Sequence, residues 1–327
     1  MIIDVLFDID KNQLYYDVEF CQFLEKFECD SFYDSIEFHN YHQKFISKVY
    51  RIFIKSNNKL LGYCYMGNDQ NLLKSPYSSP FSLIFFRHNY TVKDACHFIS
   101  GIKLISKHLN MNKVRFTLPP VIYSKELINI LNAAFFSEGF TVKSLEINNY
   151  FDLKTHKDLE THLKLSPHKV RKNYKSAVRN GLVFSEISLE DIEIAYNVIL
   201  TNREQMGYPL RIPLEQMRNI VNFENLVTRC FVVTKEELVI ASAIIFDVNE
   251  NVSQVVYWGD NNEYRNERPM EMLTLEVINF YMKLGKKYLD IGPSSENGII
   301  NTGLAEFKKS IGCNTNNKII FEYTLGV

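Results

Sequence analysis

Apolar residues in the first half of the chain recur with two periods, one typical of strands and the other typical of helices. Residues 49–54 and 59–65 are short apolar segments separated by a polar turn, which predicts a β-hairpin. Apolar side chains at helical spacing predict a helix over residues 92–109. The same reasoning predicts strands at 82–86, 113–118 and 140–153 and a helix at 124–137.

The second half of the chain repeats this order of elements. A predicted helix at residues 166–180 ends at Gly181, a residue that commonly terminates helices. Leu304, Phe307 and Ile311 have helical spacing and are predicted to share one buried face. The other predicted elements are helices at 189–206, 214–221 and 269–284, a hairpin of 230–234 and 238–247, and strands at 252–258, 287–291 and 318–325.

This repetition predicts two α+β domains, each a mixed, mainly antiparallel sheet flanked by helices. A chain of 327 residues is also long for a single hydrophobic core. We place the boundary near residue 154, where a predicted strand gives way to polar residues. The predicted domains are therefore residues 1–153 and 154–327.

Charge and composition limit the partners of the protein. The formal net charge is -1, so no global basic field recruits nucleic acid or an anionic membrane, and any anion site is local. No apolar run approaches the ~20 residues that span a bilayer, and residues 1–4 do not begin a signal peptide. We therefore expect a cytoplasmic protein. The cysteines form no CxxC pair and are expected to be buried free thiols: Cys21, Cys29, Cys64, Cys96, Cys230 and Cys313.

The predicted helix at residues 166–180 is strongly basic and contains no acidic residue. Its basic residues are Lys169, Arg171, Lys172, Lys175 and Arg179. One interpretation is a solvated charged face, which is common on helices. The other is a cationic wall for a phosphorylated donor, either the nucleotide of coenzyme A or a tRNA acceptor stem.

The end of the chain carries the most specific pattern. The strand Lys287-Tyr-Leu-Asp-Ile291 leads through Gly292 and a polar loop into Phe307-Lys-Lys-Ser-Ile-Gly312. This order resembles the C-terminal half of Fem-type (FemAB-like, BioF2-like) acyltransferases: a helix, a strand ending in aspartate, a loop and then Phe-Lys-x-x-Ile-Gly. These acyltransferases are the peptidoglycan-bridge branch of the GNAT (acyl-CoA N-acyltransferase) superfamily. The resemblance covers about residues 140–327, and the first domain matches by element order only.

The resemblance implies tandem GNAT-like domains, the first degenerate and the second an acyltransferase. In this superfamily an amine attacks the donor thioester or ester directly, and the enzyme positions the reactants and stabilises the oxyanion. The lysine of the family's Phe-Lys pair points toward the donor phosphates or the transition state. We transfer that role to Lys308 alone; the alternative is an ordinary exposed helix lysine.

Two strand ends carry the other candidate catalytic groups. Asp290 ends the strand at 287–291, where its carboxylate could accept a proton from the attacking amine or could bond the turn at Gly292. Tyr257 and Trp258 end a strand that would bulge in a GNAT fold and offer a backbone N–H to the thioester oxygen. The two strands are expected to splay apart, and the thioester would enter at the splay.

Residues 260–269 occupy the position of the GNAT pyrophosphate loop. That loop usually carries Gln/Arg-x-x-Gly-x-Gly/Ala, whose bare amides at a helix start bind phosphate. This chain has no glycine there, and Fem-type sequences also lack it. We predict that Arg265 and Arg268 replace the amide donors with guanidinium groups. We further predict that Arg268, Lys308 and the basic helix line one anion-accepting cleft.

Histidine placement disfavours other chemistries. All eight histidines lie at or before His168, which argues against Ser-His-Asp and Cys-His catalysis in the second domain. His39 and His42 could share a helix face, but no further ligand set lies nearby, so no metal site is predicted.

Together these patterns favour an N-acyltransferase. It would move an acyl group from acyl-CoA, as co-substrate, to an amine on a small molecule or a cell-envelope precursor. One alternative is aminoacyl-tRNA-dependent addition of an amino acid to a peptidoglycan precursor, which the neutral overall charge disfavours. The other is a non-catalytic, degenerate GNAT protein that binds a ligand or partner, which the missing glycine loop keeps open.

Overall fold

The computed structural model describes residues 2–16, 31–155 and 158–326, and their contacts form two compact units. Unit 1 contains Met1–Glu146 and Asn317–Val327, and unit 2 contains Ile147–Asn316. The sequence placed one boundary near residue 154 and assigned the chain end to the second domain. The last residues belong to unit 1 because β16 (Asn314–Thr324) pairs with a strand of that unit. Cys21 and Cys29 lie outside the described residues.

The sheet of unit 1 is mixed. Its strand order is β2-β1-β3-β4-β5-β7-β16, with β6 paired to β4. The pairs β1–β3 and β5–β7 are parallel, and the other pairs are antiparallel. The strands are β1 (Ile2–Asp8), β2 (Gln13–Tyr16), β3 (Lys48–Ser56), β4 (Lys59–Asp69), β5 (Leu72–Ser75), β6 (Phe85–Phe86) and β7 (Lys113–Thr117).

Helices cover both faces of this sheet. Apolar residues of α3 (Val92–His108) and α4 (Lys125–Ser137) pack with inward residues of the strands in the main core of the unit. Thr91 and Asp94 form a capping box that fixes the start of α3. On the other face lie η1 (Phe32–Asp34), α2 (Ile36–His42) and η2 (Gln43–Phe45), and the ring of His39 stacks on Tyr65 of β4 with 3.6 Å between centroids.

The sheet of unit 2 contains the candidate site. Its strand order is β8-β13-β12-β11-β10-β9. The pair β12–β13 is parallel and the other pairs are antiparallel. The strands are β8 (Thr141–Asp152), which begins in unit 1, β9 (Leu182–Ile187), β10 (Val227–Lys235), β11 (Leu238–Asp247), β12 (Val252–Asp260) and β13 (Tyr288–Pro293).

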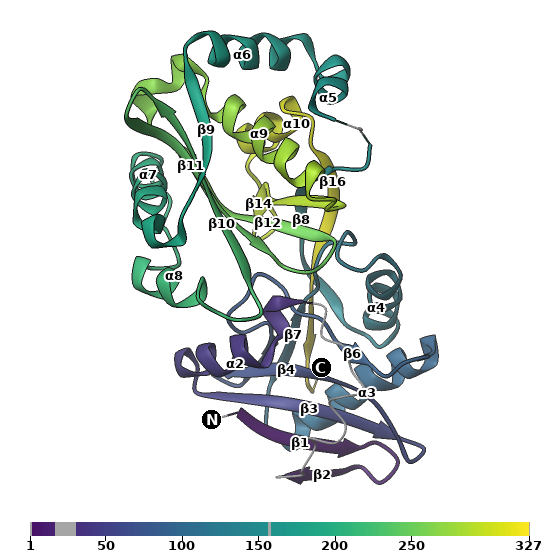
Figure 1. The fold of residues 1–327 in the computed structure, drawn as a ribbon. Helices are drawn as coiled ribbons and strands as arrows, with labels where there is room; N and C mark the ends of the chain where they lie inside the picture. The colour runs from purple at the N-terminus through teal and green to yellow at the C-terminus, as the bar shows by residue number, and fades with distance from the viewer. Residues whose placement is uncertain (1, 17–30, 156–157, 327) are drawn as a thin grey trace. The chain divides into compact units, whose positions relative to one another are not determined.

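Side chains of β11 alternate between two helical layers in unit 2. Ala241 and Ala243 join the core under α9 (Pro269–Lys283) and α6 (His168–Arg179). Ser242 points the opposite way, and its hydroxyl donates to a carbonyl of α7 (Ile192–Gln205) at 2.7 Å. Figure 1 shows α7 and α9 on the two sides of β10 and β11. The remaining elements are α5 (Leu159–Leu165), η3 (Leu189–Asp191), α8 (Leu214–Ile220), η4 (Asn262–Glu267), the hairpin β14 (Ser295–Glu296) and β15 (Ile299–Ile300), and α10 (Thr302–Ser310).

The predicted fold class, α+β with mixed and mainly antiparallel sheets flanked by helices, is confirmed in both units. The strand predicted at 82–86 is reduced to β6. Among the described residues, six strands and two α-helices were not predicted: β1, β2, α2, β5, α5, β9, β14 and β15.

Candidate functional site

Strands β12 and β13 run parallel over three residue pairs and then separate. The pairs join Val252–Gln254 to Tyr288–Asp290. Beyond them β12 continues against β11, where Tyr257 pairs with Ile244 and Val255 pairs with Ile245. Val256 therefore has no partner across the ladder and forms a β-bulge. The predicted splay and bulge are both present, and the bulge lies two to three residues beyond the point of divergence.

The bulge decides which side chains of β12 face which layer. Val255 and Trp258 both pack with the core under α9, so Trp258 is partly a core residue. Tyr257 carries its hydroxyl to Ile212, whose N–H donates to it at 3.1 Å. Burial raises the pKa of the Tyr257 phenol, and the nearby charge of Arg203 lowers it. Tyr257 is thus a protonated, anchored wall of the site.

The Asp290 carboxylate is buried at the divergence, with 1% of the residue exposed. Its Oδ1 accepts from the Asn148 amide and from the Gly292 N–H, both at 2.9 Å. Its Oδ2 accepts from the Gln254 amide at 3.1 Å. Gly292 has φ +74°, a left-handed conformation that suits glycine. The turn contact that the sequence allowed is therefore present, and amides from β8 and β12 also hold the carboxylate.

Lys308 of α10 contacts the backbone of β13 directly after Asp290. It is 3% exposed, and its ammonium donates to the carbonyl oxygens of Ile291, Gly292 and Pro293 at 2.8, 2.9 and 3.0 Å. Burial lowers the pKa of Lys308 to about 8, while the charge of Asp290 raises it. Lys308 therefore fixes the backbone of β13 where it leaves β12.

The prediction that Leu304, Phe307 and Ile311 share a buried face was wrong. Ile311 is buried, but Phe307 is 37% exposed and Leu304 is similarly exposed. The backbone carbonyls after Asp290 attract the lysine and set the rotation of α10, which turns Phe307 outward.

Arg203 of α7 is a site residue that the sequence reasoning missed. Gly259 lets α7 approach β12, because a Cβ on Gly259 would lie 2.9 Å from Cβ of Asn202. The Asn202 amide donates to the Asp260 carbonyl at 2.8 Å and to its carboxylate at 3.0 Å. The next residue, Arg203, then lies over the Tyr257 ring, with 5.9 Å from Cζ to the centroid. Its guanidinium has no hydrogen bond or ion pair to the described residues. One arginine on a helix of mixed charge gives no sequence signal for this placement.

The basic helix α6 presents most of its cations to solvent. Val170 and Ala177 bury its inner side against the core of α9. Lys175 is exposed on its outer side, and Arg171 donates to the carbonyl of Lys164 at 2.6 Å. Within the described part of the chain, no hydrogen bond or ion pair joins α6 to Lys308 or Arg268, so the shared anion cleft stays a prediction.

The two predicted phosphate-binding arginines differ in their contacts. Arg265 makes long contacts of 3.4 Å to the carboxylate of Asp260. Arg268 precedes α9 with φ +68°, and its half-buried side chain has no ion pair to a described residue. Arg268 is therefore the better placed of the two to bind an anion.

In the described ranges, no group of three or more His, Cys, Asp or Glu side chains could hold a metal ion. Within the same ranges, no helix combines the length and the apolar character needed to cross a bilayer.

Comparison with known proteins identifies the fold. No family model matches the sequence, and no curated protein matches it. The crystal structure of FemX is similar over 93% of this chain and 94% of that chain, with a TM-score of 0.67 and 13% identity. This chain has the FemX fold. The predicted Fem-type fold is thus confirmed, and the similarity extends beyond residues 140–327 into unit 1.

Two further solved structures are similar to this chain: a putative lysylphosphatidylglycerol synthetase and a protein named L-PGS. The C-terminal domain of the putative enzyme from Agrobacterium fabrum has a TM-score of 0.56 over 80% of each chain, at 11% identity. The structure of L-PGS from Bacillus licheniformis has a TM-score of 0.54 over 80% of each chain, at 12% identity.

Proposed function

We propose that the protein transfers an acyl or aminoacyl group to the nitrogen of an amine. The observation that carries this proposal is the divergence of two parallel strands beside the β-bulge at Val256, with Asp290 and Lys308 buried at the point of divergence. In the reaction, a bond forms between the amine nitrogen and the donor carbonyl carbon. The bond from that carbon to the donor sulfur or oxygen breaks, and the amine loses a proton.

We assign the roles from the positions of the groups. The backbone N–H groups around Val256 and Tyr257 donate to the carbonyl oxygen as negative charge develops on it. Lys308 holds the carbonyls of β13 and keeps the two strands apart. Asp290 accepts the amine proton, directly or through a water, at its Oδ2 edge. If Asp290 only anchors the turn at Gly292, the amine arrives already neutral.

The start of α9 bears on the identity of the donor. Coenzyme A would place its pyrophosphate at the first turn of this helix, where backbone amides bind phosphate in GNAT proteins. Here Pro269 lacks an N–H, and Glu271 puts a carboxylate into the first turn. These residues weaken a pyrophosphate site. The putative lysylphosphatidylglycerol synthetase of the same fold is named for an aminoacyl product. We therefore favour an aminoacyl group, carried as the ester of a tRNA.

Acyl-CoA, which the sequence favoured, is the second candidate donor. The specific observation in its favour is the guanidinium of Arg268, which stands beside the start of α9 without an ion pair to a described residue. A guanidinium can bind a phosphate with two parallel hydrogen bonds.

Donor binding to the full chain tests the proposal and separates the two donors. Trp258, the only tryptophan, lies on β12 next to the bulge, so its fluorescence reports directly on this site. We expect aminoacyl-tRNA to change the emission at micromolar concentration and coenzyme A to change it weakly. Deacylated tRNA and a K172E/K175E variant separate contacts to the RNA from contacts to the acyl group. If neither donor changes the emission or the thermal stability, the transferase proposal is wrong.

A further inference from the structure

Unit 1 contains a cavity of about 240 Å³ between the end of η2 and the turn that joins β4 to β5. Gly67 of β4 lets two of the lining residues, Ile46 and Tyr77, pack closely against the strand. A Cβ on Gly67 would lie 2.5 Å from Cδ1 of Ile46 and 2.6 Å from Cβ of Tyr77. An engineered cavity of about 150 Å³ is known to bind benzene. The cavity of unit 1 therefore has room for one small ring and its substituents.

One wall of the cavity is apolar and aromatic. It is formed by Phe45, Ile46 and Tyr77. The Tyr77 hydroxyl is already engaged, because it lies 2.8 Å from Nδ1 of His39. Tyr77 therefore offers the carbon surface of its ring to the cavity. A flat C–H surface of a ligand would pack well against this wall.

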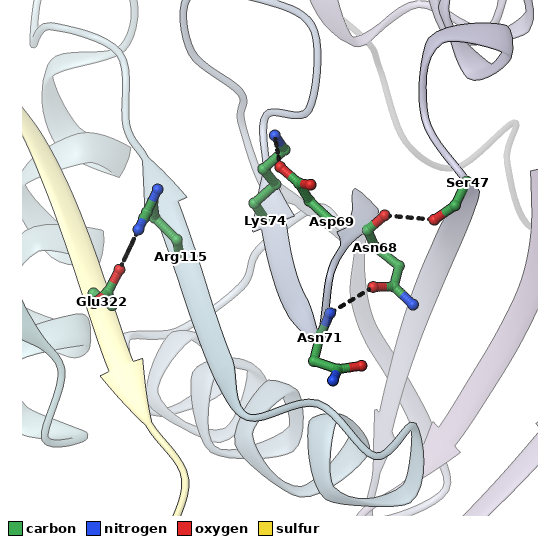
Figure 2. Close-up of polar contacts among 7 residues, drawn as sticks. All are labelled: Ser47, Asn68, Asp69, Asn71, Lys74, Arg115 and Glu322. Atoms are coloured by element: carbon green, nitrogen blue, oxygen red, sulfur yellow. Dashed lines mark hydrogen bonds and ion pairs between the residues drawn. The ribbon is translucent and has the colours of Figure 1, made fainter.

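The remaining lining residues form a polar wall, whose groups partly satisfy one another. Lys74 and Asp69 form an ion pair of 2.6 Å, and Ser47 donates to the Asn68 carbonyl at 2.8 Å. The Asn68 side-chain oxygen accepts from the Asn71 N–H at 3.3 Å. Figure 2 shows these contacts gathered around the turn. They leave the Asn68 amide hydrogens, the second Asp69 oxygen and the remaining ammonium hydrogens of Lys74 for a ligand.

The charges of this wall compensate one another. Lys74 is paired with Asp69, and Arg115, opposite Lys74 on β7, is paired with Glu322 of β16. Figure 2 shows the Arg115–Glu322 pair on the two strands beyond Lys74. A phosphate or carboxylate would have to compete with Asp69 for the Lys74 ammonium. A hydroxyl group would instead accept from Lys74 and donate to Asp69, bridging the pair without breaking its charge balance.

We propose that this cavity binds a neutral saccharide, with one sugar ring in contact with both the apolar and the polar lining residues. A pyranose has the required chemistry: a face of C–H groups for the aromatic wall, and vicinal hydroxyls that each donate and accept for the polar wall. The site is made entirely of unit 1 residues. It stands on the cavity and its lining alone, and it does not depend on the transferase activity proposed for unit 2.

Saturation-transfer NMR on the full chain tests this inference. The probes are glucose, galactose, mannose and N-acetylglucosamine at concentrations up to tens of millimolar, with glucose 6-phosphate as the charged comparison. We expect transfer from the protein to the ring C–H protons of at least one neutral sugar. The variants are D69N, which keeps the size of the side chain, and K74M, which keeps its length. The control is K113M. Lys113 lies on β7, where it pairs with Glu322 at 3.7 Å, and it does not line the cavity.

The dissociation constant of the bound sugar should rise about tenfold in D69N and in K74M, because each loses a hydrogen bond to a charged group. It should not change in K113M. Near-ultraviolet circular dichroism confirms that each variant is folded. Three results would overturn the inference: no neutral sugar binds, all variants bind equally, or only the phosphorylated sugar binds.

Discussion

Replacement of Lys308 by methionine should change the stability of unit 2 in a way that depends on pH. The three carbonyl oxygens that Lys308 caps would lose their donor, at about 2 kcal/mol each. The substitution also removes the unfavourable free energy of burying the Lys308 ammonium, which offsets part of this loss. Burial lowers the pKa of Lys308 from 10.5 to about 8, which corresponds to about 3 kcal/mol. We therefore expect K308M to lose about 3 kcal/mol at pH 7.

The pH dependence follows from the direction of the pKa change. Between pH 8 and 10.5 the unfolded chain keeps a proton on Lys308 that the folded chain has released. Unfolding therefore takes up a proton, and the free energy of unfolding of the wild type rises with pH in this window. The K308M variant has no such group. The difference in the free energy of unfolding between the wild type and K308M should therefore grow from about 3 kcal/mol at pH 7 to about 6 kcal/mol at pH 10.5.

Urea denaturation followed by tryptophan fluorescence measures this difference. Trp258 packs with the core of unit 2, so its emission reports the unfolding of that unit. Other groups that titrate between pH 8 and 10.5 affect both proteins and cancel in the difference. The matched control is K309M, which removes the exposed neighbouring lysine and should change stability by less than about 0.5 kcal/mol. A difference that stays constant from pH 7 to 10.5 would refute the reasoning about the buried ammonium.

Three other substitutions test separate parts of the account. D290N should reduce transfer by about 10²–10⁴-fold while donor binding is retained; loss of donor binding would make Asp290 structural, and unchanged turnover would remove it from the mechanism. G259A should destabilise unit 2 by about 1–3 kcal/mol, because the new Cβ meets Asn202 at 2.9 Å. A stable variant with normal donor binding would show that the approach of α7 does not position the site. In unit 1, burial raises the pKa of Asp34 from 3.8 to about 7, so the folded state keeps a proton that the unfolded state loses. Stability should therefore fall by about 4 kcal/mol between pH 4 and pH 7, and D34N, compared by near-ultraviolet circular dichroism, should lack this decline.

Periodicity and turn chemistry predicted most of the long elements. The hairpin of β3 and β4, the helices α3 and α9 and the strand β13 each carry a strong local pattern, which tertiary contacts then reinforce. Short edge elements carry less of a pattern. β5 was not predicted because it is only four residues long and ends directly before Pro76, and β9 was not predicted because it lies at the edge of the sheet beside β10.

The sequence placed Asp290 at the end of a strand, whereas β13 continues to Pro293 and only its pairing with β12 ends at Asp290. Asp290 was placed by its position before Gly292, and β13 does separate from β12 directly after it. The burial of Lys308 depends on three carbonyls that are 15 to 17 residues away in sequence, so no local pattern reports it. Arg203 is positioned by a contact between Gly259 and a helix that lies far from it in the chain.

A direct transfer assay tests the central claim. The full chain is incubated with an isotope-labelled aminoacyl-tRNA or acyl-CoA and a defined mixture of primary amines containing amino acids, amino sugars and a lysine-ended peptide. Mass spectrometry then measures labelled amide products. We predict that the wild type forms a labelled amide from one of the donors and that D290N forms far less. If the wild type binds neither donor and forms no amide while unit 2 is folded, unit 2 does not transfer acyl groups.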